Sequence, residues 1–433
     1  MAKKRKCSPK EEQVLAEKLL AAMPQTPQGG DSILGLLQTG AQFLLKGAIE
    51  QEITQHLGRT YYQHRGTGEA SKGERNGYRP TRIDTPSGQV VYDRPLLAYA
   101  PEFKSQFHAP NMRRPEAFAN AVVDMHVNGV STRNVKRALK SVAGEKARLS
   151  KSSVSRITKR IRAEFSQWKK RDLSKLPVIY LFLDAIRLGM RMESTRKDAV
   201  LIAYAVLEDG SFETLSIAVR SSESGAAWED FLVDMKRRGL RDPLLVVSDG
   251  NPGVIQAIEK DFPTAWRQRC VKHRTDNILE AVPQEEAVQK EVYSDLHKIF
   301  YGATSLEQAK QGVEDFRKKY RNRYPSAVAC LERDLPQCLT FYLFPASHWK
   351  RIRTSNRLER MNLEIKRRLN AIGRHPSEEG CLALVYQLCK VYAQGRKGFK
   401  ANDLVKALWA RLREKKLEMI EQLELNFHTE KAA

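Results

Sequence analysis

The chain has 433 residues, of which 41% are hydrophobic and 29% charged, a composition that excludes collagen-like, disordered and membrane-embedded classes and predicts two to four folding units. Its formal net charge is +23, and a folded protein this positive is expected to bind a polyanion, nucleic acid before an anionic membrane surface. The six cysteines are irregularly spaced and the basic N-terminus leads into no apolar segment, so we expect no disulfide framework, no secretory signal and a location in the cytoplasm or nucleoid.

Residues 1–110 predict a helical region followed by a small hairpin. From Ile33 to Leu57 the apolar residues recur at helical spacing, which favours a pair of amphipathic helices. Two short β-prone runs then flank the turn-forming Pro86-Ser87-Gly88, and Arg75 to Arg79 adds basic side chains before them. We therefore expect one antiparallel hairpin with basic flanks.

Residues 111–172 predict short helices with the composition of a helix-turn-helix DNA-binding domain. Asn128-Gly129 ends the first helix, Ser131 can cap the second, and Ser150 to Ser155 opens the third with polar residues. A recognition helix presents such side chains to the major groove from its first turns. A helical connector with a solvated face fits the pattern about equally, and the net charge favours DNA. The expected DNA contacts are Lys151, Ser152, Ser153, Arg156 and Lys159.

Residues 173–273 predict a mixed β-sheet with helices outside it. Two apolar, β-prone runs end in carboxylates, at Asp184 and at Asp249, and such runs are typical of strands that are buried on both faces. Further strands are predicted over 186–192, 199–207, 212–219 and 266–270, with a helix over 226–238. The order of hairpin-like strands followed by a strand–helix–strand unit indicates an α/β fold.

The rest of the chain predicts helices. Residues 274–345 are helical and rich in charge, without clear strands. Residues 346–400 hold a long basic helix from Ser355 to Asn370 and a second helix from Ser377 to Ala393. Residues 401–433 form a helical tail, whose pattern is more often that of a packing helix than of a zipper.

Glu359 is an acidic residue in this strongly basic helix. The residues three and four positions away from it include no cation, so a local ion pair does not explain it. It shares a helical face with Asn362 and Lys366. An acid in this setting can join a metal site while its basic neighbours hold phosphate, although it could also be one more solvated charge.

Asp184, Asp249 and Glu359 together indicate a metal site. Ligands bind beyond the carboxyl ends of strands in open α/β sheets, where the two aspartates are expected. Three converging carboxylates repel one another unless cations are present, and hard oxygen ligands select Mg²⁺ or Mn²⁺. Two such ions can activate a water or a 3′-hydroxyl for attack on a phosphodiester. Each acid alone is more simply a turn, strand-end or surface residue; the set, the predicted fold and the charge favour the metal site.

Cys270 and His273 form a Cys-x-x-His motif, which could be half of a zinc site. Zinc in structural sites takes four ligands, and the sequence offers no second close pair. We therefore favour a role for His273 in ordering the site, by positioning phosphate or a carboxylate, over structural zinc.

Four runs resemble, in order, the motifs of the Mutator-type bacterial insertion-sequence transposases. The four runs are Leu183-Asp184-Ala185-Ile186, Ser248-Asp249-Gly250, Gln268 to His273 and Thr354 to Asn362. The resemblance extends from about Leu36 to Tyr392, and it departs from the family pattern at Ala185 and at Arg357-Leu358 without removing a carboxylate. It implies that Asp184, Asp249 and Glu359 are the family's DDE triad, with Cys270, His273 and Asn362 as auxiliary residues.

The resemblance also implies a fold and a reaction. The fold would be ribonuclease-H-like, interrupted by an all-helical insertion at about 274–345. The enzyme would bind the terminal inverted repeats of its element as a homodimer or larger assembly, cleave DNA with Mg²⁺ or Mn²⁺, and join the freed 3′-hydroxyl to target DNA. Further DNA contacts are expected at Arg353, Arg357 and Lys366. The alternatives are a DNA-binding regulator with an inert catalytic domain and a zinc-stabilised nucleic-acid-binding protein.

Overall fold

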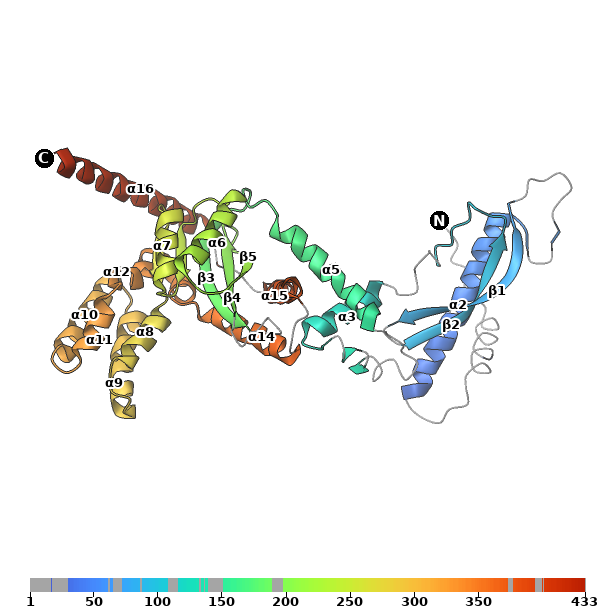
Figure 1. Ribbon diagram of the computed structural model, residues 1–433, viewed down its shortest axis with the longest axis horizontal. Helices are drawn as coiled ribbons and strands as arrows, with labels where there is room; N and C mark the ends of the chain where they lie inside the picture. The colour runs from blue at the N-terminus through green and yellow to red at the C-terminus, as the bar shows by residue number, and fades with distance from the viewer. Residues whose placement is uncertain are drawn as a thin grey trace. The chain divides into compact units, whose positions relative to one another are not determined.

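The computed structural model describes residues 17, 30–60, 63–64, 72–85, 88–107, 116–131, 134–135, 137–138, 151–188, 198–372, 377–393, 399 and 401–432. The chain divides into two compact units, residues 1–159 and 160–433 (Figure 1). The boundary falls within helix α5, Lys151–Lys169.

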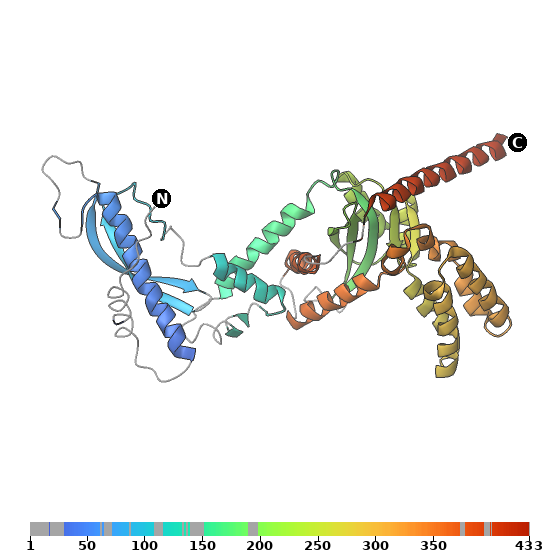
Figure 2. The same ribbon diagram turned by 180° about the vertical axis from the view of Figure 1, so that it is seen from behind.

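The first unit contains a long helix, α2, Gly30–Leu57, lying along a two-stranded antiparallel sheet (Figure 1 and Figure 2). The strands are β1, Glu74–Thr85, and β2, Gly88–Ala98, so the predicted hairpin is confirmed. Ile49 and Ile53 of α2 pack against Ile83 and Tyr92 of the sheet. The predicted pair of helices is instead one helix, because this apolar stripe holds its C-terminal half on the sheet and no proline interrupts it.

A smaller helix, α3, Glu116–Val127, follows in the same unit. Phe118 and Val122 on one of its faces pack against Val135, which lies beyond the turn at Gly129. Gly129 has a φ of 96°, a conformation that favours glycine, and this ends the helix where the sequence predicts.

The second unit is built on a mixed sheet, as predicted, and its five strands have the order β5-β4-β3-β6-β7. Strands β3, Val178–Leu188, β4, Asp198–Leu207, and β5, Phe212–Arg220, pair antiparallel to one another. Strands β6, Leu245–Ser248, and β7, Trp266–Arg269, extend the sheet parallel to β3.

Strand β3 runs through Asp184 rather than ending there, which differs from the prediction of a second strand over 186–192. Its antiparallel pairing with β4 continues from Asp184, opposite Ile202, to Leu188, opposite Asp198. Its parallel pairing with β6 stops earlier, at Phe182. Asp184 therefore lies beyond the end of β6. It is beside Asp249, the first residue after that strand.

Helices cover both faces of the sheet. Helices α6, Gly225–Arg237, and α7, Pro252–Asp261, contribute Trp228, Phe231 and Ile258 to a core that also holds alternate residues of β3 and β4. The intervening residues face the other way: Tyr204 of β4 contacts α15, Glu378–Ala393, through the Cys389 sulfur at 3.4 Å. Because side chains alternate along a strand, Asp184 lies on this second face.

Residues 274–345, all of which the structure describes, contain helices and no strand, as predicted, and helices continue on both sides of this segment. The helices are α8, Val271–Glu280, α9, Glu286–His297, α10, Leu306–Tyr320, α11, Pro325–Glu332, α12, Leu335–Cys338, and α13, Ala346–Ile352. Gln268 of β7 ties this segment to the sheet, since it donates to the Cys338 carbonyl and accepts from the Phe341 amide at 2.7 Å.

Two more helices complete the unit. Helix α14, Asn356–Ile372, packs on the sheet through the buried Leu358, Met361 and Ile365, and it contacts β3 and α15. Helix α16, Asp403–Ala432, is anchored by the buried Trp409, whose indole donates to the Tyr180 hydroxyl at 2.9 Å, and it continues outward from the sheet (Figure 1). Within the described part of the chain, no helix has the length and apolar character to cross a membrane.

Candidate active site

Asp184 is held on β3 by two hydrogen bonds. The amide of Ala185 donates to its Oδ1 at 2.8 Å, and the Asn362 side chain of α14 donates to its Oδ2 at 2.6 Å. Asn362 is 4% exposed, so this contact fixes the helix that carries Glu359 against the strand that carries Asp184. The sequence places Asn362 and Glu359 on one helical face, and the structure adds that this face meets β3.

Asp184 has a strongly raised pKa. Burial, with a smaller contribution from the negative charges of Asp249 and Glu359, raises the pKa of this carboxyl to about 7, while the Ala185 amide and His273 oppose the change. The three acids are therefore close enough to interact electrostatically, although they come from β3, the end of β6 and α14. A carboxyl in this state is stabilised by any cation that enters the site.

Asp249 follows β6 at the start of a tightly packed turn. Its Oδ1 accepts from the Asn251 amide at 3.1 Å, and Asn251 in turn caps α7 by accepting from the Gly253 amide at 2.8 Å. A Cβ atom at Gly250 would lie 0.7 Å from Nη1 of Arg269, so the buried guanidinium lies directly against this residue. Glycine at position 250 is thus required by the packing of Arg269 against it.

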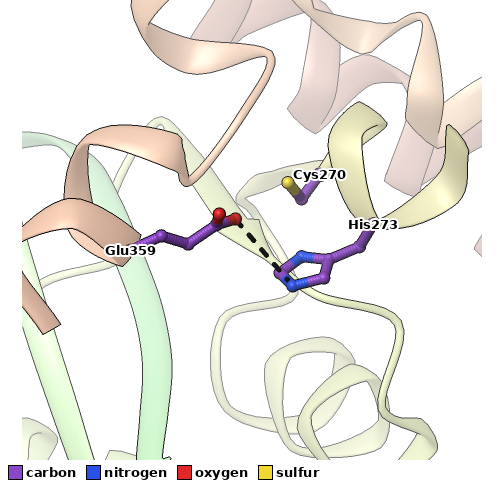
Figure 3. A group of neighbouring side chains, drawn as sticks. All are labelled: Cys270, His273 and Glu359. Carbon is purple, nitrogen blue, oxygen red and sulfur yellow. Dashed lines mark ion pairs between the residues drawn. The ribbon is translucent and has the colours of Figure 1, made fainter. Parts of the chain in front are cut away.

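Glu359 lies in the first turn of α14 and has two polar neighbours. The Ser355 hydroxyl is 3.1 Å from its Oε1, and Nε2 of His273 is 3.8 Å from the same oxygen (Figure 3). Ser355 also contacts Cys270, since its amide and its hydroxyl lie 3.4 and 3.2 Å from the Cys270 sulfur. The Cys-x-x-His motif therefore packs against the start of the helix that presents Glu359.

Cys270 and His273 change each other's protonation. The Cys270 sulfur raises the pKa of His273 to about 9 against the effect of burial, with help from Glu359 and Asp249. Burial opposes ionisation of the Cys270 thiol, but the neighbouring His273 outweighs it and lowers the pKa of that thiol. At neutral pH, His273 is thus a cation beside Glu359.

The donor set suits a hard divalent cation. Three carboxylates face one region, and the Oδ1 atom of Asn362 is buried without a hydrogen-bond partner, which leaves an amide oxygen free for a cation. Among the described residues, the one group of three or more Cys, His, Asp or Glu whose ligand atoms all lie within 4.8 Å of one another is Cys270, His273 and Glu359. The ligand atoms of the three carboxylates are spaced more widely than that.

The expected DNA contacts fall into three groups. Arg156 and Lys159 are exposed on α5, whereas the side chains of Lys151, Ser152, Ser153 and Arg357 lie outside the described residues. Lys366 is half-buried on α14. Arg353 donates to the Phe300 carbonyl at 3.2 Å and lies 4.2 Å from the centre of the Tyr301 ring, so it also has a packing role.

Sequence reasoning missed several residues that support the site. Arg269 fills the space over Gly250, Ser355 connects Cys270 to Glu359, and Arg274 ties α8 to the helical segment through Asp334 at 2.7 Å. Arg269 and Ser355 lie inside motifs that the sequence singles out, which was the available signal. Their partners are distant in sequence, so nothing local identifies what they do.

Comparison with known proteins identifies the family of this chain. The sequence profile described as "Transposase, Mutator family" matches residues 11–395. The transposase for insertion sequence element ISRM5 of Rhizobium meliloti (strain 1021) is 33% identical over 363 residues, covering 80% of this chain and 84% of that protein. The transposase for IS6120 of Mycolicibacterium smegmatis is 32% identical over 65% of this chain and 86% of its own. The transposase for IS1081 of Mycobacterium tuberculosis (strain ATCC 25618 / H37Rv) is 31% identical over 86% of each chain. The chain therefore belongs to the Mutator family of transposases.

Proposed function

We propose that this transposase binds the terminal inverted repeats of its insertion sequence and cleaves and rejoins DNA by a metal-dependent DDE mechanism. The observation that supports this most is the electrostatic convergence of Asp184, Asp249 and Glu359 from three separate elements. A stable fold has no use for three acids at one point, because their repulsion destabilises it. Phosphodiester cleavage does require such a cluster, because the three acids together can hold divalent cations.

The second unit would then be a ribonuclease-H-like catalytic domain. Its sheet order and its antiparallel-then-parallel strands support this assignment. Residues 173–273 and 346–400 would form the core and 274–345 a helical insertion, with 401–433 as a tail. The N-terminal residues 1–110 and 111–172 would carry the hairpin region and the DNA-binding domain.

Asp184, Asp249, Glu359 and Oδ1 of Asn362 would hold Mg²⁺ or Mn²⁺. When bound, these ions activate a water or a 3′-hydroxyl and stabilise the leaving oxygen. The chain's own contribution is orientation. Asn362 directs Asp184, Asn251 and Arg269 fix the turn that carries Asp249, and protonated His273 with Ser355 holds Glu359.

The basic side chains would hold the DNA. Arg156 and Lys159 present cations from α5, and Lys366 lies two turns along α14 from Glu359. Lys151, Ser152, Ser153, Arg353 and Arg357 complete the proposed set of contacts to the inverted repeats and the target. Because two ends must be brought together, the working form would be a homodimer or a larger assembly.

The test is cleavage of a labelled duplex that carries the element end, with Mg²⁺ and purified full-length protein. Asp249→Asn and Glu359→Gln should each slow cleavage by at least about 10³-fold, since metal stabilisation of the transition state amounts to several kcal/mol. Both variants should retain DNA binding in a gel-shift assay. Asp230→Asn, an exposed aspartate on α6, is the matched control and should cleave normally. Full cleavage by either active-site variant would contradict the proposal.

A further inference from the structure

A second set of metal ligands adjoins the three carboxylates and shares one of them. Cys270, His273 and Glu359 each offer one ligand atom, and these atoms all lie within 4.8 Å of one another. Cys270 precedes α8 and His273 lies in its first turn, while Glu359 comes from α14. Figure 3 shows the Glu359 carboxylate directed at the His273 ring, with the Cys270 sulfur close to the same ring.

The sulfur is held in place before any ligand arrives. Cys270 is fully buried, and both the amide and the hydroxyl of Ser355 are directed at its Sγ. Nδ1 of His273 is buried and has no hydrogen-bond partner. A buried nitrogen without a partner beside a fixed sulfur is costly in a purely structural cluster, and a bound ion would satisfy it.

The chemistry of this set differs from that of the three carboxylates. A thiolate and an imidazole are soft or borderline ligands that favour Zn²⁺, whereas Mg²⁺ prefers oxygen. Three protein ligands leave the fourth tetrahedral position of zinc for water, which is the arrangement of an open zinc site. The sequence offers only two of the three ligands as a motif; the third, Glu359, is brought by the fold.

The spacing allows an ion to bind after a small movement. Ligand atoms around tetrahedral zinc lie about 3.3–3.8 Å apart, given bond lengths of about 2.0–2.3 Å. Nε2 of His273 already lies 3.8 Å from Oε1 of Glu359, so the ring adjoins this carboxylate, and an ion bound through Nδ1 would use the other nitrogen of the same ring. No two of the three ligand atoms lie more than 4.8 Å apart, so side-chain shifts of about 1 Å would bring them to zinc-binding distances.

We propose that Cys270, His273 and Glu359 form a Zn²⁺ site that competes with Mg²⁺ for Glu359 and so inhibits DNA cleavage. The binding of zinc stands on these three residues alone. Inhibition also rests on the proposed function, because it requires that Glu359 serve the catalytic ion.

Cobalt provides a direct test of binding, since Co²⁺ replaces Zn²⁺ and a cobalt–thiolate bond absorbs in the near ultraviolet. Reduced, metal-stripped full-length protein titrated with Co²⁺ should develop this charge-transfer band with one ion per chain, and Zn²⁺ should abolish it. Cys270→Ser should lose the band, and His273→Gln should weaken Zn²⁺ binding by more than about tenfold. Cys330→Ser is the matched control, because Cys330 is a partly buried cysteine outside the site. This variant should keep both the cobalt–thiolate band and the Zn²⁺ affinity. Circular dichroism of each variant establishes that it is folded.

No thiolate band in the wild type, or a band that persists in folded Cys270→Ser, would overturn the zinc site. Inhibition is measured separately, as the ratio of the Mg²⁺-dependent cleavage rates without and with Zn²⁺. This ratio should exceed about tenfold in the wild type and fall toward one in Cys270→Ser, whatever that variant's own rate. An equal ratio in the wild type and in Cys270→Ser would overturn the claim that zinc competes with Mg²⁺ for Glu359. If the wild type showed no Mg²⁺-dependent cleavage, the proposed function would fail, and the cobalt titration would still decide the zinc site.

Discussion

Replacing Asp184 with asparagine should make the metal-free protein more stable at alkaline pH while abolishing cleavage. Burial and two neighbouring acids raise the pKa of Asp184 from 3.8 to about 7, so its ionised form destabilises the folded state. The introduced asparagine can keep both contacts: its oxygen accepts from the Ala185 amide, and its amide group donates to Oδ1 of Asn362 once that side chain flips. The substitution therefore removes the charge with little loss of hydrogen bonding.

The magnitude follows from the pKa change. The rise in the pKa of Asp184 from 3.8 to about 7 corresponds to about 4 kcal/mol of folding free energy, at 1.36 kcal/mol for each unit of pKa. Asp184 is only partly buried, so solvent screening reduces this, and we expect a gain of about 1–2 kcal/mol. Because the pKa of Asp184 is higher in the folded than in the unfolded state, the free energy of unfolding falls as pH rises from about 4 to about 7. The gain from Asp184→Asn should therefore be larger at pH 8 than at pH 5.

Thermal unfolding in EDTA measures this gain. At pH 8 the melting temperature of the variant should exceed that of the wild type by about 2–8 °C, since 1 kcal/mol shifts a unit of this size by about 2–4 °C. Asp230→Asn, on the exposed face of α6, should not change it. Added Mg²⁺ should stabilise the wild type more than Asp184→Asn. A variant no more stable than the wild type at pH 8, or equally stabilised at pH 5 and pH 8, would refute the reasoning.

Two further substitutions test the support of the site and the DNA-binding domain. Gly250→Ala places a methyl group 0.7 Å from the present position of Arg269 Nη1, so the guanidinium must move and cleavage should fall at least about tenfold with end binding intact. Gly47→Ala, on α2 with open space around it, is the control, and equal cleavage by both variants would count against a role for this packing. The double change Arg156→Ala, Lys159→Ala should weaken binding to the element end and reduce the slope of log K against log salt by about two units. Unchanged binding in a salt titration would place the DNA-binding residues elsewhere in the chain.

The elements of the sheet were predictable because their burial follows from local composition. The apolar run before Asp184 and the run before Asp249 both form the expected strands, and the helical segment after His273 contains no strand. Strand β3 continues through Asp184 because β4 pairs with it there, and that pairing depends on a different part of the chain. Likewise α2 is one helix because a sheet formed later in the sequence supports it.

The candidate site was predictable as a set of residues and not as an arrangement. Helical periodicity places Asn362 and Glu359 on one face, but nothing local shows that Asn362 donates to Asp184. The spacing of Cys270 and His273 suggests a shared ligand, yet the third member of their group, Glu359, comes from another helix. The role of Arg269 depends on how closely β7 approaches the turn after β6, which only the folded sheet determines.

Iron-directed cleavage of the polypeptide tests the central claim most directly, which is that three acids from separate elements hold one set of divalent ions. Fe²⁺ in place of Mg²⁺, with ascorbate and peroxide, generates hydroxyl radicals that cut the backbone next to the bound ion. The account predicts cuts near Asp184, Asp249 and Glu359 in the same DNA-bound protein, all suppressed by excess Mg²⁺ and lost in Asp184→Asn. Cuts confined to one of these segments, or cuts that Mg²⁺ does not suppress, would contradict it.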